Sequence, residues 1–423
     1  MLMGYNAESI FIIRSKQEGV CRWLEHSMGH YARKAGLPLP GFINAGDGRH
    51  EHPTQEFLDE FSFLEYYRWD RSQIHIALVG DLFHGRTVHS KTEGLRIFSN
   101  VQVDLIAPVE IAMPEHYIEA MKANGFQIRI FESISEYLTQ PRQAPVWYFT
   151  RLQLERMGEK LLKQGEQLRN AVTFQQEYMN RIDPKTRFFH PLPRHSEMPT
   201  IPTFLDNTPF NAWDEQSRNG YFTRIIEIGM LGGLFGSDFK GNGPLLQGQE
   251  EPFIEEAPIR QKLKPEYKIG IRPVDEGLVI DHIGTGGDPR QIWDHITKIR
   301  NILGLHLVSS QGVFMNEKKE HYKGIISVPG LRSLDDTQIR MLAAIAPDCT
   351  LNIVSDHRVK RKYRLGLPGH VRGLDGICCR NPDCISNPIY FEPVIQDFRR
   401  SNHGTFVCTY CNTPHEYRDI WAP

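Results

Sequence analysis

The first half of the chain alternates short apolar runs with stretches of helical period. Runs rich in β-branched and aromatic residues, which favour strands, cover residues 8–13, 74–79, 103–107, 127–131, 146–150 and 188–193. Apolar residues recur with helical spacing at about residues 19–34, from 52 onwards, and at 87–98, 114–124, 153–171 and 219–231. Repeated strand–helix units of this length predict an α/β domain with a Rossmann-like, doubly wound parallel sheet.

The pattern stops at residues 236–266. Glycines and prolines mix there with the acidic pairs Glu250-Glu251 and Glu255-Glu256, and no apolar period survives. This composition predicts an interdomain linker.

A different order of elements follows the linker. Asp288-Pro289 provides an N-cap and an N1 proline for a helix, and Ser333 to Asp336 resembles a capping box for a second helix that ends before Pro347. Strands are predicted at residues 278–283, 305–309, 323–328 and 350–354. The resulting order, β-α-β-β-α-β, is ferredoxin-like. A small cysteine-bearing unit closes the chain.

Cysteines crowd into the last part of the sequence. Cys379-x4-Cys384 and Cys408-x2-Cys411 are two pairs of a kind that can present four thiolates to one tetrahedral zinc ion. We expect one structural zinc per chain in a small zinc-ribbon-like β domain, with Cys378 as a spectator. The alternative is a set of reduced, unligated cysteines.

Composition excludes some function classes. The 423 residues are 40% hydrophobic and 24% charged, with a net charge of −2, which gives no broad electrostatic footprint for nucleic acid. No apolar run approaches the roughly 18 residues of a membrane helix, and the first residues lack a signal-peptide pattern. We therefore expect a cytoplasmic protein without nucleic-acid or membrane partners. A zinc-ribbon nucleic-acid binder is a weaker alternative.

Polar residues gather where the predicted strands end. The stretch from Ile74 to Ser90 is a strand, a glycine turn and a helix start, and in an open α/β sheet ligands bind at this edge. The candidate residues are Arg14, His52, Gln55, Arg86, Thr87, Arg151, Gln153, Leu192 and Pro193. Several arginines at such positions suit a polyanionic substrate. The alternative for each is an ordinary turn with its arginine in solvent.

Four motifs resemble aspartate carbamoyltransferase catalytic chains: His52-Pro-Thr-Gln55, Gly80-Asp-Leu-Phe-His-Gly-Arg-Thr-Val-His-Ser90, Thr150-Arg-Leu-Gln153 and His190-Pro-Leu-Pro-Arg194. The part after the linker resembles that enzyme's regulatory chain through Gly277 to Ile283, Leu351-Asn352 and the four cysteines. The whole therefore resembles a catalytic–regulatory fusion of pyrimidine biosynthesis. Ornithine carbamoyltransferases typically carry His-Pro-Cys-Gln and His-Cys-Leu-Pro at the corresponding places, so aspartate is the expected substrate.

The resemblance implies roles in transferring a carbamoyl group from carbamoyl phosphate to L-aspartate. Arg14 and His52 would contact the carbamoyl oxygen and the phosphate, and Gln55 with the carbonyls of Leu192 and Pro193 would orient the carbamoyl amide. The residues expected to hold the aspartate carboxylates are Arg86, Thr87, Arg151 and Gln153. A trimer or a multiple of trimers is expected.

In the regulatory half, the positions that match nucleotide-contacting residues of the family are Asp281, His282, Asn352, His357 and Lys362. Ser327 stands where a nucleotide-binding lysine is usual. The basic run from Arg358 to Arg364 either assists triphosphate binding or is a solvated strand edge.

The resemblance also predicts the domains. They are a partial carbamoyl-phosphate-binding domain (1–53 and 212–235), an aspartate-binding domain (54–211), the linker (236–266), a regulatory ferredoxin-like domain (267–366) and a zinc-binding domain (367–423). The family's Ser-Thr-Arg-Thr phosphate loop does not occur in the sequence. The alternative function is an impaired or inactive scaffold that retains the nucleotide and zinc domains.

Overall fold

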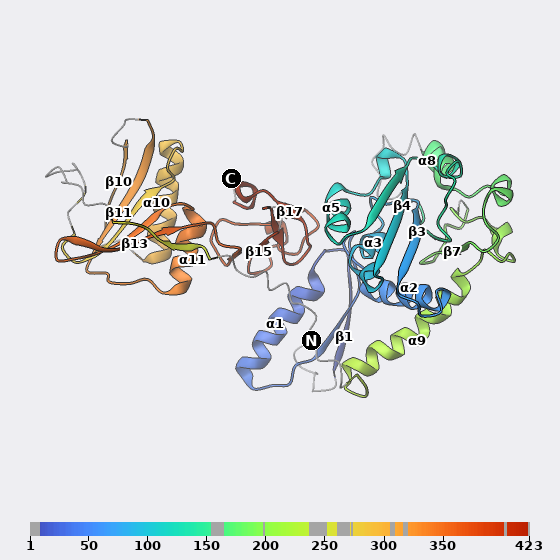
Figure 1. Ribbon diagram of the computed structural model, residues 1–423. Helices are drawn as coiled ribbons and strands as arrows, with labels where there is room; N and C mark the ends of the chain where they lie inside the picture. The colour runs from blue at the N-terminus through green and yellow to red at the C-terminus, as the bar shows by residue number, and fades with distance from the viewer. Residues whose placement is uncertain are drawn as a thin grey trace. The chain divides into compact units, whose positions relative to one another are not determined.

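The structure, a computed structural model, describes residues 9–153, 165–197, 199–236, 252–259, 271, 274–304, 309–315, 320–401 and 404–421 (Figure 1). The chain forms two compact units. The first comprises residues 1–241 with 381–394 and 410–412, and the second comprises the remainder.

A parallel sheet is the centre of the first unit. Among the described residues it has five strands in the order β5-β4-β3-β6-β7. Their bounds are β3 Gln73–Val79, β4 Asn100–Ile106, β5 Gln127–Phe131, β6 Val146–Phe149 and β7 Arg187–Phe189. Every residue from Ile74 to Val79 is buried, so both faces of the sheet are covered, as is typical of parallel sheets. The predicted doubly wound fold is confirmed.

The helices of this unit are α1 Val20–Ala35, α2 Pro53–Tyr66, α3 Arg86–His89, α4 Lys91–Gly94, α5 Glu115–Ala123, α6 Ile134–Tyr137, α8 Gly165–Val172 and α9 Trp213–Leu231. The single helix expected at 87–98 is wrong, because the chain makes α3, α4 and a 3-10 turn there. Gly94, at the end of α4, faces α2 so closely that a Cβ would lie 2.1 Å from Glu56 Oε1. Most of the helix expected at 153–171 lies outside the described residues.

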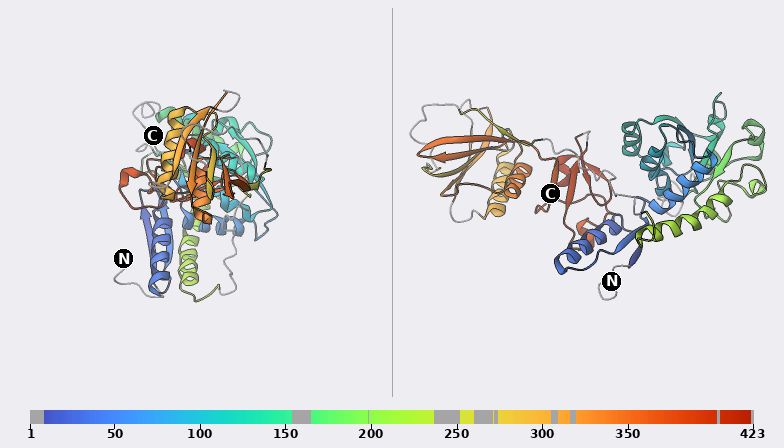
Figure 2. Two further views of the ribbon diagram at one scale, coloured as in Figure 1. Left: turned by 90° about the vertical axis from the view of Figure 1, so that its left-hand side faces the viewer. Right: turned by 60° about the horizontal axis from the view of Figure 1, so that its bottom comes forward.

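A small parallel pair, β1 Ile10–Ser15 and β2 Gly41–Asp47, lies beside the start of α2. The long helix α9 packs on α2 and ends beside β2 (Figure 2), where a Cβ on Gly41 would lie 3.4 Å from Leu231 Cβ. Large apolar side chains on this part of the unit are exposed, including Ile12 (61%), Tyr221 (68%) and Leu234 (82%).

The second unit contains a sheet of six described strands in the order β10-β11-β9-β12-β13-β8. The bounds are β8 Ile254–Glu256, β9 Gly277–Ile283, β10 Ser310–Met315, β11 Tyr322–Pro329, β12 Thr350–Ser355 and β13 Arg358–Leu365. With α10 Pro289–Leu303 and α11 Asp336–Ile345, the order from β9 to β12 is the predicted ferredoxin-like arrangement.

Most of the strand expected at 305–309 lies outside the described residues, and β10 begins at Ser310. Two other local predictions in this unit need correction. The cap of α11 is Asp335, which makes a capping box with Gln338, because the helix begins two residues later than the Ser333 box would require. Residues of the predicted linker form β8, which pairs with the end of β13. The basic run is therefore not the edge strand along its whole length.

The C-terminal part of the second unit is a small antiparallel sheet, β14-β15-β16-β17. Its strands are β14 His370–Arg372, β15 Asp397–Arg400, β16 Phe406–Cys408 and β17 Pro414–His415. Throughout the described ranges, every helix is too short or too polar to span a bilayer.

A buried carboxylate ties three neighbouring strands of the first unit together. Asp104 on β4 is fully buried and accepts hydrogen bonds from His75 Nε2 (2.6 Å), Tyr137 OH (2.6 Å) and Arg129 Nε and Nη2 (both 2.7 Å). Burial alone would raise the pKa of Asp104, but these hydrogen bonds outweigh it and hold the pKa below its ordinary value of 3.8.

Asp104→Asn should lower the free energy of unfolding by about 3–5 kcal/mol at neutral pH, because it removes the buried negative charge that pairs with Arg129 and sets an NH₂ group among donors. Since the folded pKa lies below the unfolded one, the carboxylate's contribution is fully present above the unfolded pKa. It is lost as pH falls through the folded pKa. Urea titrations of both proteins at neutral and acidic pH should show the gap closing on acidification. A gap that is constant across pH would contradict this account.

Candidate active site and metal centre

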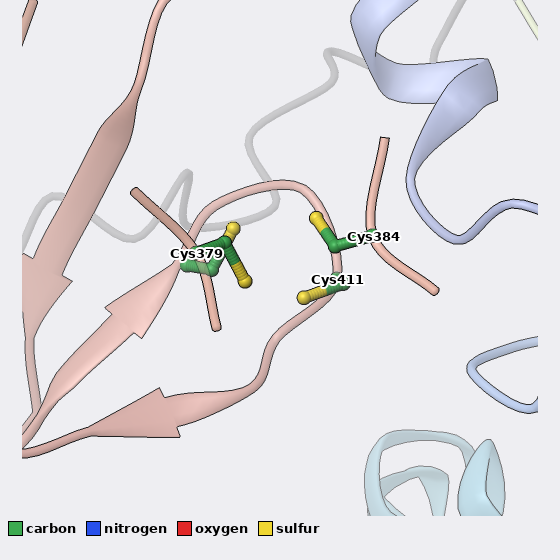
Figure 3. Close-up of side chains that lie close together, drawn as sticks. Cys379, Cys384 and Cys411 are labelled. Carbon is green, nitrogen blue, oxygen red and sulfur yellow. The ribbon is translucent and has the colours of Figure 1, made fainter. Parts of the chain in front are cut away.

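The four cysteines predicted as metal ligands come together. The sulfur atoms of Cys379, Cys384, Cys408 and Cys411 all lie within 4.8 Å of one another, and all four residues are buried. Figure 3 shows Cys384 and Cys411 on facing turns with their sulfur atoms turned towards Cys379. Four buried thiolates at this spacing fit one tetrahedral metal ion with no open position. Cys378 is buried and lies outside the cluster.

Two neighbours of the cysteines were not found from the sequence. His415 Nε2 lies 3.4 Å from Cys379 Sγ, and Ser386 Oγ lies 3.2 Å from Cys384 Sγ. Donors beside ligand sulfurs offset negative charge and orient the ligands. The spacing Cys408-x-x-Cys411 is closed by a backbone hydrogen bond from Cys408 N to Thr413 O (3.0 Å).

The turn that carries Cys384 is held by the N-terminal segment of the first unit. Glu18 N donates to Asp383 O (2.7 Å), Asn381 Nδ2 donates to the Glu18 carboxylate (2.6 Å), and Ile385 N donates to Glu18 O (2.9 Å). The residue after Cys411 is held in the same way, because Asn412 Nδ2 donates to Glu51 Oε1 (2.9 Å). Glu18 is 4% exposed, so these contacts are shielded from water.

The β3 strand ends at Val79 and is followed by Gly80, which has a φ of +121°. A Cβ at this position would lie 2.4 Å from Thr150 O, so only glycine lets the ends of β3 and β6 approach this closely. Asp81 then accepts from His84 N (2.9 Å) and Gln153 N (3.2 Å), while Gln153 Nε2 donates to His84 O (2.8 Å). The side chain of Gln153 therefore supports the loop before Arg86.

Arg86 begins α3 and lies against the β2–α2 loop. Its Nη1 is 3.5 Å from Gly48 O. A Cβ on Gly46, whose φ is +105°, would lie 2.8 Å from Arg86 Cζ. The positive φ of Gly46, near the end of β2, favours glycine, and the missing side chain leaves room for the guanidinium group. The next residue, Thr87, lies beside Tyr148.

His52 caps α2 through its ring. Nδ1 accepts from Gln55 N (3.3 Å), and His52 N donates to Ser90 Oγ (3.2 Å). Burial, followed by the positive charges of Arg86, Arg14 and Arg224, lowers the pKa of His52 to about 3. The imidazole is therefore neutral at physiological pH. Because Nδ1 is the acceptor, the proton lies on Nε2, which is a donor.

Arg224 is a member of this group that the sequence motifs did not indicate. It comes from α9, and its guanidinium donates to Thr54 O (2.6 Å) and Thr54 Oγ1 (3.1 Å). The sequence showed only that Arg224 lies within the helix predicted at residues 219–231. Arg14, on β1, is exposed and donates to Ala45 O (3.2 Å).

Gln55 and the His190–Pro193 loop are joined by hydrogen bonds. Gln55 Nε2 donates to Asp59 Oδ1 (2.9 Å), Gln216 Nε2 donates to the same oxygen (2.6 Å), and Gln216 Oε1 accepts from His190 N (2.8 Å). The loop contains a cis Leu192–Pro193 bond, and Leu192 N donates to His190 Nδ1 (2.8 Å).

Arg151 belongs to the same loop region. Burial, then the charges of Arg194 and Arg151, lowers the pKa of His190 to about 3. The structure therefore brings Arg14, His52, Gln55 and Arg86 around the start of α2. It brings Arg151, Leu192 and Pro193 around His190.

The predicted nucleotide residues lie mostly on one face of the second unit's sheet. Asn352 pairs with both Val279 and Lys362, and Thr350 pairs with Asp281. Directly opposed residues share a face, and the buried Leu278 and Ile280 occupy the other one. His282 Nδ1 is 3.4 Å from Thr350 Oγ1. Lys323, which the sequence motifs did not indicate, binds Asp281 at 2.9 Å.

His357 is not brought to this group. It lies in the β12–β13 turn and pairs with Asp275 at 2.7 Å, near the beginning of β9. Asp281 lies near the end of β9, about 20 Å away at roughly 3.3 Å per residue.

Comparison with known proteins identifies the family. Domain models match residues 72–224 (aspartate/ornithine carbamoyltransferase, Asp/Orn binding domain), 269–366 (aspartate carbamoyltransferase regulatory chain, allosteric domain) and 369–421 (the metal binding domain of that regulatory chain). Protein PyrBI of Thermotoga maritima is 50% identical over 425 residues, covering 100% of this chain and 80% of that protein. The chain belongs to the aspartate carbamoyltransferase family. The predicted catalytic–regulatory fusion, a transferase of pyrimidine biosynthesis, is confirmed at this level.

Catalytic relatives match the first part of the chain. The aspartate carbamoyltransferase catalytic subunit of Saccharophagus degradans is 33% identical over 238 residues, covering 55% of this chain and 65% of that subunit. Aspartate transcarbamoylase from Trypanosoma cruzi, solved in complex with N-(phosphonacetyl)-L-aspartic acid, is 28% identical, with a TM-score of 0.43. That match covers 53% of this chain and 65% of the solved one.

Cys408→Ser should abolish metal retention, because serine does not supply the thiolate that completes the site. Cys378→Ser is the matched control. It changes a buried cysteine beside Cys379 that lies outside the cluster, and it should retain the metal content of the parent protein. Metal analysis after dialysis, with thermal unfolding, measures both effects. Equal metal content in the two variants would contradict the four-cysteine assignment.

Proposed function

We propose that the chain transfers the carbamoyl group of carbamoyl phosphate to the α-amine of L-aspartate, releasing phosphate. The observation that carries this proposal is a neutral histidine, His52, among the charges of Arg14, Arg86 and Arg224. Such a group offers an anionic acyl phosphate a hydrogen-bond donor and several positive charges together. The family membership supports the same reaction.

On the carbamoyl-phosphate side, His52 Nε2–H and Arg14 donate to the carbamoyl oxygen and phosphate and stabilise the charge that develops as the amine attacks. Gln55 and the carbonyls of Leu192 and Pro193 accept from the carbamoyl NH₂. The reaction needs no covalent enzyme intermediate, so positioning and electrostatics supply the rate.

On the aspartate side, Arg86 and Arg151 bind the two carboxylates, because guanidinium groups match carboxylates in geometry and charge. Thr87 stands beside Arg86. Gln153 positions the loop that leads to Arg86 through its contact with His84 O. Loss of either arginine would therefore weaken the binding of aspartate more than the binding of carbamoyl phosphate.

Incubation with carbamoyl phosphate and aspartate should yield carbamoyl aspartate, and His52→Ala should lower kcat by about 10²–10³. Because the pKa of His52 is lowered to about 3, its ring stays neutral between about pH 5 and 8, where a free histidine titrates. The pH profile should show no His52-dependent step in that range. His30→Ala, an exposed position on α1, serves as control. Zinc and nucleotide binding without any product would favour the alternative, an inactive scaffold.

We infer that the metal is one structural Zn²⁺ per chain. A set of four thiolates is the donor set that zinc prefers in closed sites, and the lack of an open position suits a structural role. The same reduced cysteines support a cytoplasmic location, where thiols stay reduced. Family catalytic chains are expected to form trimers, so we propose a trimer or a multiple of trimers, with no nucleic acid or membrane as partner.

We propose that one face of the sheet binds a nucleotide effector through Asp281, His282, Asn352 and Lys362. Lys323 supplies the positive charge that the family usually has at the position of Ser327. The regulatory allosteric-domain match supports this role. His357 is retained as a predicted contact only if the ligand extends along the sheet.

Lys362→Ala should weaken binding of a nucleoside triphosphate, measured by calorimetry with ATP and CTP, by about tenfold, since one charge-assisted hydrogen bond is worth roughly 1.5–3 kcal/mol. Arg361→Ala is the control, because strand alternation turns that residue to the other face. A larger effect at Arg361 than at Lys362 would overturn the assignment of the face.

A further inference from the structure

Asp59 is a fully buried carboxylate in α2, one turn after Gln55. Its Oδ1 accepts from Gln55 Nε2 (2.9 Å) and Gln216 Nε2 (2.6 Å). Its Oδ2 accepts from Tyr148 OH (2.6 Å) and Lys91 Nζ (2.8 Å). All four neighbours are donors, and an ionised carboxylate can only accept.

This restriction fixes the orientation of Gln55. A glutamine amide has one donor end and one acceptor end. Because its NH₂ group donates to Asp59, its Oε1 is the atom left for other partners. Gln55 sits at the start of α2, three residues after His52, and its backbone N–H donates to the His52 ring. Gln55 Oε1 is therefore the acceptor that this side chain presents to the part of the site next to His52.

Asp59 fixes Gln216 in the same way. With its NH₂ group on Asp59, Gln216 turns its Oε1 to His190 N at 2.8 Å. This bond holds the beginning of the loop that carries the carbonyls of Leu192 and Pro193. One carboxylate thus orients both the glutamine and the loop that the proposed reaction uses to hold the carbamoyl NH₂.

Lys91 binds the second carboxylate oxygen of Asp59, Oδ2. Lys91 is fully buried, and its ammonium group also binds Glu56 and lies 4.4 Å from the centre of the Tyr148 ring. Tyr148 also lies beside Thr87, the neighbour of Arg86. Breaking such a buried ionic group by removing one partner is costly, so Asp59 is held in one place.

We propose that Asp59 is a positioning residue that makes the carbamoyl pocket an acceptor-only pocket and so selects acyl phosphates with an NH₂ group over those with a methyl group. This inference rests on the proposed function. Carbamoyl phosphate donates through its NH₂, whereas acetyl phosphate, similar in size and charge, presents a methyl group that leaves the acceptors unpaired. A site built to hydrogen-bond a substrate group discriminates strongly against an analogue that lacks it.

The test compares the binding of carbamoyl phosphate and acetyl phosphate by calorimetry to the full chain and to Asp59→Asn. Asparagine keeps one acceptor oxygen for four donors and turns an NH₂ group towards at least one of them, which loosens the restraint on the two glutamines. Preference for carbamoyl phosphate should fall by about 10–100-fold, with acetyl phosphate and inorganic phosphate little changed. Asp104→Asn is the matched control, since it also removes a buried four-bond carboxylate charge, and it should keep the preference. An undiminished preference in Asp59→Asn would overturn the inference.

A second measurement separates this inference from the proposed function. In protein labelled with ¹⁵N-glutamine, the side-chain NH₂ signals of Gln55 and Gln216, assigned through Gln55→Met and Gln216→Met, should be protected from hydrogen exchange. Asp59→Asn should remove that protection from at least one of them. Binding of neither acyl phosphate by the parent chain would defeat the proposed function. Unchanged protection of both signals in Asp59→Asn would defeat the positioning role.

Discussion

Burying a carboxylate obliges everything around it to donate, and this constraint organises the first unit. Asp104 and Asp59 are both fully buried, and each is surrounded by donors from several elements. At Asp104 the donors come from three neighbouring parts of the sheet and its cover, so the constraint serves stability. At Asp59 two of the donors are amides with an acceptor at the opposite end. The same constraint therefore fixes the orientation of the Gln55 and Gln216 side-chain amides at the site.

The positive charges of the site depend on similar local restrictions. Gly46 and Gly80 have positive φ values of +105° and +121°, and each leaves room that a side chain would fill. Gly46 lets the end of β2 approach Arg86, and Gly80 lets the ends of β3 and β6 meet. His52 is then surrounded by arginines from β1, α3 and α9, which come from distant parts of the sequence.

The sequence predicted those features that short-range patterns encode. The parallel sheet, the order of the ferredoxin-like elements and the four cysteines followed from apolar periodicity and spacing, and the family followed from motifs. Arg224, Lys323 and His415 were not found, because their partners lie far away in sequence and no local pattern marks them. The helix expected at 87–98 is wrong in its continuity, because apolar spacing does not show that the chain divides there into α3, α4 and a 3-10 turn. The capping box of α11 was misplaced by two residues, since both acids and Ser333 satisfied the same local rule.

The hydrogen bonds between Glu18 and the turn from Asn381 to Ile385 have a thermodynamic consequence. Glu18 lies four residues after Arg14 and two before the first residue of α1, while Cys384 lies inside the turn that Glu18 holds. Free-energy coupling between two sites is reciprocal. If metal binding stabilises the ordered form of the segment from Arg14 to Gly19, then a ligand that orders this segment raises the affinity for the metal by the same factor. Metal affinity is therefore a property of the N-terminal segment as well as of the four thiolates.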